Sequence, residues 1–196
     1  MPSAEDPAAT PRTTRTPRTD SVRNRDKLLA VARTAFAAAA GPVSLEGVAR
    51  EAGVGIGTLY RHFPTREDLV EAVYATQLDE VTDSAAALLR ELPPDAALRA
   101  WMGNYATFFT TKRGRIDTLR AGWATGRITT PNTRERITAA IATLLAAGAE
   151  TDSLRSDINP DDLTLMLLGI CTAAGDAPDQ VDRLLDLVMD ALRTAD

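Results

Sequence analysis

Four side chains that can hydrogen-bond to nucleic acid, Thr58, Tyr60, Arg61 and His62, lie in one short segment, residues 56–63. If this segment is helical, at about 100° per residue, then Gly57, Thr58 and Arg61 share one face. Tyr60 and His62 lie on the two flanks of that face. This arrangement suits the major groove of DNA, where the central face meets base edges and the flanks meet phosphates. The segment is therefore predicted to be a DNA-reading helix.

The other side of this helix is apolar, and Ile56, Leu59 and Phe63 are expected to hold it against a small core. A second helix is expected just before it, because Ser44 is a good N-cap and apolar residues then recur at helical spacing. That stripe consists of Leu45, Val48, Ala49 and Ala52. Gly53 suits the turn between the helices, since glycine adopts the left-handed conformation cheaply. The pair is predicted to be a helix-turn-helix.

A long helix is predicted to follow the pair. Thr65 can cap it, and Asp68 three residues later completes a pattern that resembles a capping box. Arg66 lies in the first turn, where a positive charge opposes the helix macrodipole. An external phosphate would explain this arginine, and a solvated surface position is the alternative. The apolar stripe continues to about Leu92, which makes the helix roughly 40 Å long.

Together with a preceding helix at residues 21–39, these segments resemble the DNA-binding domain of the TetR family of bacterial transcription regulators. The resemblance rests on ARTAF at 32–36, LEGVAREAGV at 45–54 and GTLYRHFPTREDL at 57–69. It implies that Thr58 contacts bases and that Tyr60 and His62 contact the DNA backbone. It also implies that Ser44 and Arg66 clamp phosphates. The residues expected at the DNA interface are Ser44, Gly57, Thr58, Tyr60, Arg61, His62, Thr65 and Arg66.

The charge of the chain is unevenly distributed. Residues 1–66 contain 10 Lys and Arg against 6 Asp and Glu, whereas residues 67–196 contain 12 against 21. A positive end on an acidic body suggests that DNA meets the N-terminal part. Residues 1–20 are rich in Pro, Thr and Arg and are predicted to be a disordered basic arm, either solvated or reaching into a minor groove. Residues 21–70 are expected to bind DNA, and residues 71–196 to bind a ligand and dimerise.

Several other classes of protein are disfavoured by the sequence. The single cysteine, Cys171, and the single histidine, His62, predict neither a disulfide nor a metal site. No cofactor motif and no Ser/His/Asp ordering is found, so we expect no cofactor and no enzyme activity. The N-terminus lacks the apolar segment of a signal peptide, and no run approaches the roughly 20 apolar residues that span a bilayer. A cytoplasmic protein is expected.

The C-terminal part is predicted to be a helical bundle, which makes the protein all-α with about nine helices. Helices are expected at about 95–111, 114–126, 132–148, 160–174 and 178–194, the fourth capped by Asn159 and begun by Pro160. Aromatic residues cluster in the first of these helices. They are either the core of the bundle or the wall of a small-molecule pocket. The candidate pocket residues are Trp101, Met102, Tyr105, Phe108, Phe109, Arg120, Trp123 and Met166.

The last two helices are predicted to form a dimer interface. Apolar residues surround nearly all of the helix at 160–174, so it needs cover on more than one face. Two such helices from each subunit would build a four-helix interface with twofold symmetry, as the TetR resemblance implies and a palindromic operator requires. The expected interface residues are Leu163, Leu167, Ile170, Val181, Leu184, Leu185, Val188 and Leu192.

The hypothesis from the sequence is a dimeric DNA-binding regulator, acting as a repressor, that a hydrophobic small molecule releases from a pseudo-palindromic operator. Two alternatives stay open at this point. One is a DNA-binding regulator controlled by a protein partner instead of a ligand. The other is a helical carrier or enzyme for a small molecule.

Overall fold

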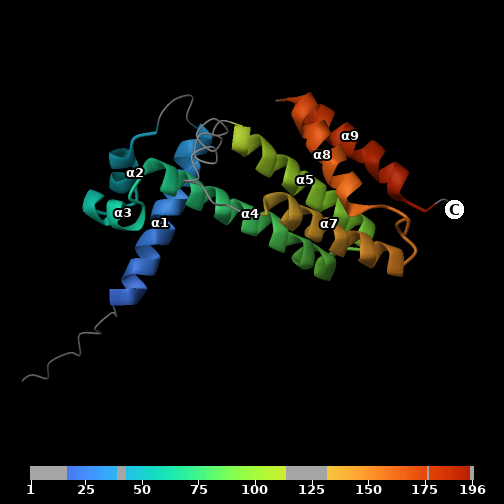
Figure 1. Ribbon diagram of the computed structural model, residues 1–196, viewed down its shortest axis with the longest axis horizontal. Helices are drawn as coiled ribbons and strands as arrows, with labels where there is room; N and C mark the ends of the chain where they lie inside the picture. Colours follow the sequence, from blue (N-terminus) through green and yellow to red (C-terminus); the bar gives the residue numbers. More distant parts are fainter. Residues whose placement is uncertain (1–16, 39–42, 114–131, 176, 195–196) are drawn as a thin grey trace, which may run out of the picture.

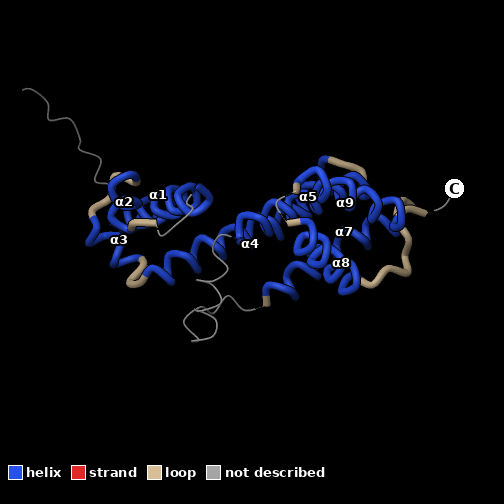
Figure 2. The backbone as a smooth tube through the Cα atoms, turned by 90° about the horizontal axis from the view of Figure 1, so that it is seen from above, coloured by secondary structure: helices blue, strands red, loops and turns tan. Residues whose placement is uncertain are grey.

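The computed structural model describes residues 17–38, 43–113, 132–175 and 177–194, which form eight α-helices (Figure 1). The described part of the chain contains no strand, as Figure 2 shows, and the predicted all-α fold is confirmed. The expected helix at 114–126 lies outside the described residues. The helices are α1 (Pro17–Ala38), α2 (Leu45–Glu51), α3 (Ile56–His62), α4 (Arg66–Glu91), α5 (Pro94–Arg113), α7 (Thr133–Glu150), α8 (Pro160–Ala174) and α9 (Pro178–Leu192).

The helices gather at the two ends of α4 (Figures 1 and 2). At one end, α1 packs on α4, and α2 and α3 pack on α1 and on each other; with the start of α4 these three helices form what we call the head. At the other end, α5, α7, α8 and α9 form the body, and α5 and α7 lie along the rest of α4. No helix in the described ranges combines the length and the apolar character needed to cross a membrane.

The head has one small core to which all of its helices contribute. Ser44 caps α2 as predicted, because its hydroxyl accepts a hydrogen bond from the Gly47 N–H at 3.2 Å. Gly53 has φ +66°, the left-handed conformation that the turn requires. The prediction for Ile56 is wrong: it lies one turn before Leu59, at the start of a two-turn helix, and is 39% exposed. The core consists of Leu28, Ala32, Phe36, Val48, Ala49, Ala52, Leu59, Phe63, Leu69, Val70 and Val73.

The long helix α4 joins head and body. The predicted capping box is present: the Thr65 N–H donates to Asp68 Oδ2 at 2.8 Å, and the Asp68 N–H donates to Thr65 Oγ1 at 3.1 Å. The helix has 26 residues, which corresponds to about 39 Å. In the body, the indole N–H of the fully buried Trp101 donates to the carbonyl oxygen of Val81 at 2.8 Å. This bond ties α5 to the middle of α4.

The helix limits follow the predictions within a few residues. The described helix α1 begins at Pro17 and not at Ser21, so residues 17–20 are helical where a disordered arm was predicted. Residues 1–16 of that arm lie outside the described residues. Asn159 caps α8 as predicted, since the Asp161 N–H donates to Asn159 Oδ1 at 2.9 Å and Pro160 begins the helix. The last helix, α9, ends at Leu192.

The tight turn after α7 contacts the end of α9. Gly148 lies against Leu154 so closely that a Cβ at position 148 would be 2.8 Å from the Cβ of Leu154. Leu154 pairs with Arg193, and the Arg155 N–H donates to the Leu192 carbonyl at 2.9 Å. The turn therefore couples the end of α7 to the end of α9.

Candidate DNA interface and ligand pocket

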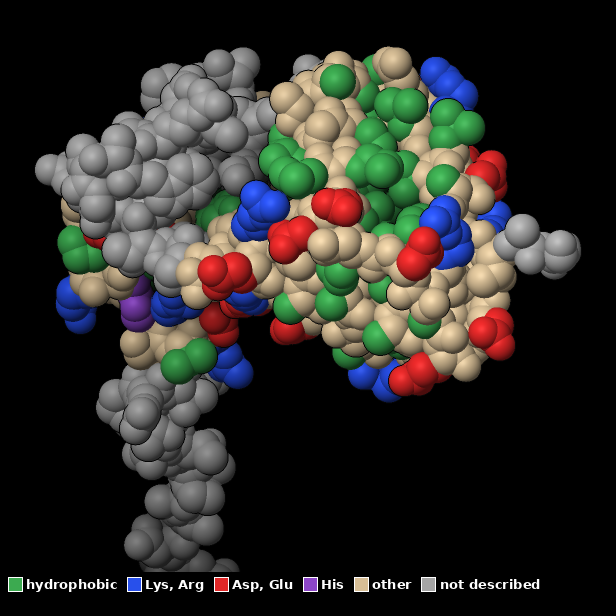
Figure 3. All heavy atoms as spheres, turned by 45° about the vertical axis from the view of Figure 1, so that its right-hand side comes forward, with side chains coloured by type: hydrophobic (Ala, Val, Ile, Leu, Met, Phe, Trp, Pro, Cys, Tyr) green, Lys and Arg blue, Asp and Glu red, His purple; other side chains and the backbone are tan. Residues whose placement is uncertain are grey.

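The outer face of α3 carries the predicted reading residues. Leu59 is fully buried, so the side chains on the opposite side of this short helix point away from the head. Gly57 and Arg61 are exposed, Thr58 is half-buried, and Tyr60 is 44% exposed. Figure 3 shows Lys and Arg side chains near the single histidine on this part of the molecule. The face thus combines hydroxyl and guanidinium groups. Major-groove bases and phosphates can accept the hydrogen bonds that these groups donate.

Arg61 is not extended into solvent along its whole length. Its Nε donates to the Gly57 carbonyl oxygen at 3.2 Å, and its Nη2 donates to Thr58 Oγ1 at 3.3 Å. Two residues predicted to face bases are therefore bonded to each other. Spacing alone puts both on one face, but it does not reveal this pair.

Ser44 and Thr65, predicted at the edge of the DNA interface, are both occupied as helix caps. The Ser44 hydroxyl also donates to Glu46 Oε2 at 3.0 Å, and Thr65 Oγ1 donates to Asp68 Oδ2 at 2.8 Å. The pKa of Glu46 is lowered, first by a hydrogen bond from its own backbone N–H and second by the Ser44 hydroxyl. Glu46 is therefore ionised at neutral pH, and Ser44 must release this carboxylate before it can contact a phosphate.

Arg66 has internal partners that the sequence did not reveal. Its Nη1 donates to the Val43 carbonyl at 3.0 Å, and its guanidinium carbon lies 6.0 Å from the centroid of the Phe36 ring. These contacts tie the start of α4 to α1 and to the segment before α2. These contacts account for Arg66 in the first turn of α4 without a phosphate. Its unfavourable position relative to the helix dipole is therefore no longer evidence for a contact with DNA.

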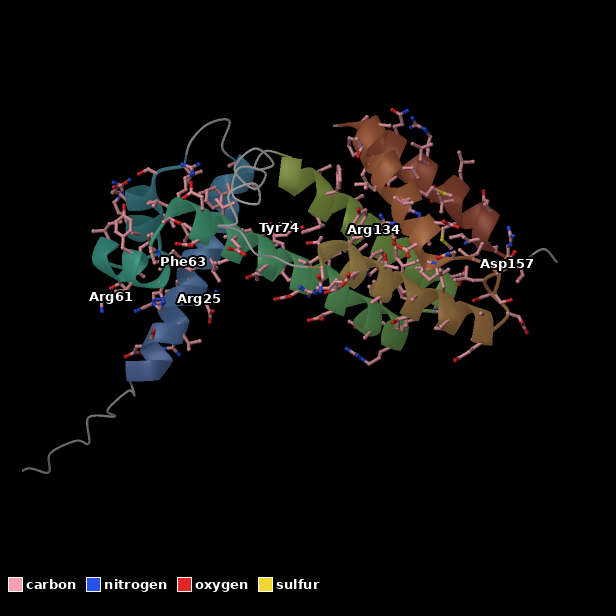
Figure 4. All side chains as sticks on the ribbon, in the orientation of Figure 1. Arg25, Arg61, Phe63, Tyr74, Arg134 and Asp157 are labelled. Atoms are coloured by element: carbon pink, nitrogen blue, oxygen red, sulfur yellow. The ribbon has the colours of Figure 1, made fainter. Side chains whose placement is uncertain are left out.

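A second arginine, Arg25, was missed at the sequence level. Its guanidinium carbon lies 5.5 Å from the centroid of the Phe63 ring, at the C-terminal end of α3. Figure 4 shows Arg25, Phe63 and Arg61 in the same part of the head. The cation–π interaction with the ring and the negative end of the helix dipole both favour a positive charge at this position. Because 38 positions separate the two residues, helical periodicity carries no signal for this contact.

An ion pair links the head to α4 across an open cleft. Arg33 of α1 donates through Nη1 to both carboxylate oxygens of Glu80, at 2.8 and 2.7 Å. The cleft beneath it, about 480 Å³, also includes Gln77 and Thr76 of α4. The bridge therefore connects α1 of the head to the middle of α4.

The body contains a cavity of about 240 Å³ between α5, α7 and α8. Three predicted pocket residues line it: Tyr105, Phe108 and Phe109. Burial raises the pKa of Tyr105 well above its ordinary value, so its hydroxyl stays protonated near neutral pH. The sequence did not single out the remaining lining residues, which come from other helices. They are Thr133, Arg134, Ile137, Thr164, Leu165 and Leu168.

The other predicted pocket residues lie elsewhere. Trp101 and Met102 are fully buried in the contact of α5 with its neighbours, which makes them core residues. Met166 is 50% exposed on α8 and does not line the cavity. Arg120 and Trp123 lie outside the described residues.

The cavity wall touches α4 through one tyrosine. The hydroxyl of Tyr74 on α4 donates to Thr133 Oγ1 at 3.1 Å, and its ring centroid lies 5.5 Å from that of Phe108. Both Thr133 and Phe108 line the cavity. Tyr74 itself is buried on α4 beyond them, and Figure 4 marks its position between head and body. A molecule in the cavity would therefore contact two residues that themselves contact Tyr74 of α4.

The predicted dimer interface needs correction, because six of its eight residues are buried within one chain. These are Leu163, Leu167, Val181, Leu185, Val188 and Leu192, while Ile170 and Leu184 are half-buried. The stripes on α8 and α9 pack on the rest of the body, where Arg99 of α5 also binds Asp182 and Asp186. The large apolar residues left exposed on α8 and α9 are Leu165, Met166, Leu168 and Leu187. Figure 3 shows hydrophobic side chains gathered on this side of the body.

Comparisons with known proteins agree with this architecture. Residues 28–73 match the family model described as bacterial regulatory proteins, tetR family. Residues 93–194 match the model of the C-terminal domain of SbtR-like transcriptional regulators. No protein of curated function matches the chain.

Two solved structures are similar over nearly the whole chain. A TetR transcriptional regulator from Streptomyces coelicolor is 44% identical, with a TM-score of 0.78, over 88% of this chain and 99% of the other. A TetR transcription regulatory protein from Mycobacterium vanbaalenii is 30% identical, with a TM-score of 0.73, over 90% of this chain and 99% of the other.

Proposed function

The chain belongs to the TetR family of transcriptional regulators, and we propose that it is a homodimeric repressor that a small molecule releases from its operator. The observation that carries this proposal is the outer face of α3, where Thr58 and Arg61 point away from the core that buries Leu59 and the exposed Tyr60 flanks them. Residues 21–70 are proposed to bind DNA, and residues 71–196 to bind the effector and dimerise. Members of this family regulate transcription, and no catalytic role is proposed.

The proposed dimer uses the exposed apolar side of α8 and α9, formed by Leu165, Met166, Leu168 and Leu187. When two copies pack through this face, their large apolar side chains are removed from water. This burial of apolar surface is the main driving force for association. A twofold axis through this face gives two reading helices, which then fit two half-sites of a pseudo-palindrome. A dimer on such a site would occlude polymerase, which favours repression over activation.

The proposed effector site is the cavity beside Phe108 and Thr133. Its volume of about 240 Å³ lies just below the usual range for ligand pockets and suits a compact molecule, and its aromatic walls suit a hydrophobic one. Contacts through Tyr74 couple it to α4, which carries the head. Release of DNA then requires that the effector bind the non-binding conformation more tightly than the DNA-binding one.

A gel-shift experiment with the purified protein and DNA from its own promoter region tests the proposal. We expect a shift by the protein alone, which a member of a panel of hydrophobic compounds then reverses. A shift that no compound reverses would favour control by a protein partner. The absence of any shift would contradict DNA binding itself.

A further inference from the structure

The hydrogen bonds of Arg61 bear on which base the reading helix selects, given the proposed binding of DNA. A guanidinium group is planar and carries five N–H donors. Nε and Nη2 form one edge of this plane, and in α3 that edge donates to the Gly57 carbonyl and to Thr58 Oγ1. The two bonds use two donors. Three remain: one hydrogen of Nη1 and one of Nη2 lie parallel and form a second edge, and the other hydrogen of Nη1 points toward the Cδ side of the group.

The remaining edge of Arg61 has no partner among the described residues. The side chain is exposed, and in the described part of the chain no carboxylate pairs with it. Figure 4 shows Arg61 at the outer edge of the head, beyond α3. Two parallel N–H donors match two adjacent acceptors. In the major groove, guanine presents such a pair through O6 and N7, which makes it the usual partner of a bidentate arginine.

We propose that Arg61 selects a guanine in each operator half-site through its Nη1/Nη2 edge, while its Nε/Nη2 edge stays bonded to α3. Thr58 then acts as a positioning residue for Arg61. Its hydroxyl accepts from Nη2 and limits the directions in which the guanidinium can point. An arginine already held in this way loses less conformational freedom on binding, so more of its hydrogen-bond energy discriminates between bases.

Selection of duplexes from a random-sequence pool tests the proposal even though the operator is unidentified. The wild-type protein is expected to enrich a motif that contains a guanine in each half-site. Replacing that guanine should weaken wild-type binding by about 5- to 150-fold, the range for a lost bidentate contact. Arg61→Lys keeps the charge but has no planar fork, and it should lose the preference at that position alone. Arg90→Lys, on the exposed far part of α4, is the matched control and should leave the motif unchanged.

The positioning role of Thr58 is tested at the same base pair. Thr58→Val keeps the shape of the side chain and removes the hydroxyl, so it should reduce the guanine preference, whereas Thr58→Ser should retain it. A motif whose guanine does not depend on Arg61 would overturn the assignment of the base. An unchanged preference in Thr58→Val would overturn the positioning role. If the wild-type protein enriches no motif, the proposed function itself fails, which is a distinguishable result.

Discussion

Replacing Gly148 by alanine tests how tightly the turn after α7 is packed. The new Cβ would lie 2.8 Å from the Cβ of Leu154, whereas an ordinary carbon contact is about 3.5–4.0 Å. Leu154 is 1% exposed, and its Cβ cannot retreat unless its backbone moves as well. Overpacking of this kind costs about 1–3 kcal/mol, and alanine returns at most about 1 kcal/mol through its helix propensity. Because the new Cβ would also meet the Cγ and a Cδ of Leu154, the cost lies at the upper end of this range, and we expect Gly148→Ala to lower the free energy of unfolding by about 2 kcal/mol.

Gly103→Ala on α5 is the matched control, because among the described residues its new Cβ would meet just Arg99 Nη1, at 3.8 Å. It should raise the free energy of unfolding by up to about 1 kcal/mol. Urea denaturation of both variants and the wild type, at equal protein concentration, measures the difference. Equal stability of the two alanine variants would refute the close contact between Gly148 and Leu154.

Three further predictions concern the dimer, the buried tyrosine and the DNA interface. Leu187→Asp on the exposed face of α9 should give monomers by light scattering, while Thr143→Asp, exposed on α7, should leave dimers; equal masses would exclude the proposed face. Burial raises the folded-state pKa of Tyr105, so its contribution to stability is present below about pH 10 and is lost as the pH rises through the raised value. Tyr105→Phe should therefore flatten the alkaline fall of the melting temperature, and an unchanged curve would contradict this. Tyr60→Ala should weaken binding to two unrelated duplexes equally, by about 10- to 100-fold if a hydrogen bond to phosphate is lost; a loss confined to one duplex would mean that Tyr60 reads bases.

Local signals allowed much of the fold to be predicted from the sequence. The cap Ser44, the capping box of Thr65 with Asp68, and the start of α8 at Asn159 all depend on residues within three positions of one another. The outward face of α3 follows from the burial of Leu59 in the same way. Such features are determined by residues within a short segment and do not depend on the tertiary structure.

Features that depend on distant segments could not be predicted. α8 is apolar on nearly all sides, so periodicity does not tell whether Leu163 or Leu165 faces the core. The strong stripe of α9 was assigned to a partner, yet its own chain covers it, and Leu187 outside the stripe stays exposed. Arg66 and Arg25 contact residues 30 and 38 positions away, Phe36 and Phe63. Only the packing of the helices brings these groups together.

The most direct test of the central claim is the capture and sequencing of genomic DNA fragments by the purified wild-type protein. Two reading helices related by a twofold axis should enrich fragments that share an inverted repeat, with half-site centres one helical turn, about 34 Å, or a multiple of it apart. Arg61→Lys should alter the sequence of the half-sites and leave their spacing unchanged. Capture of fragments with no shared repeat, or of unpaired half-sites, would contradict a dimeric regulator that reads DNA with α3.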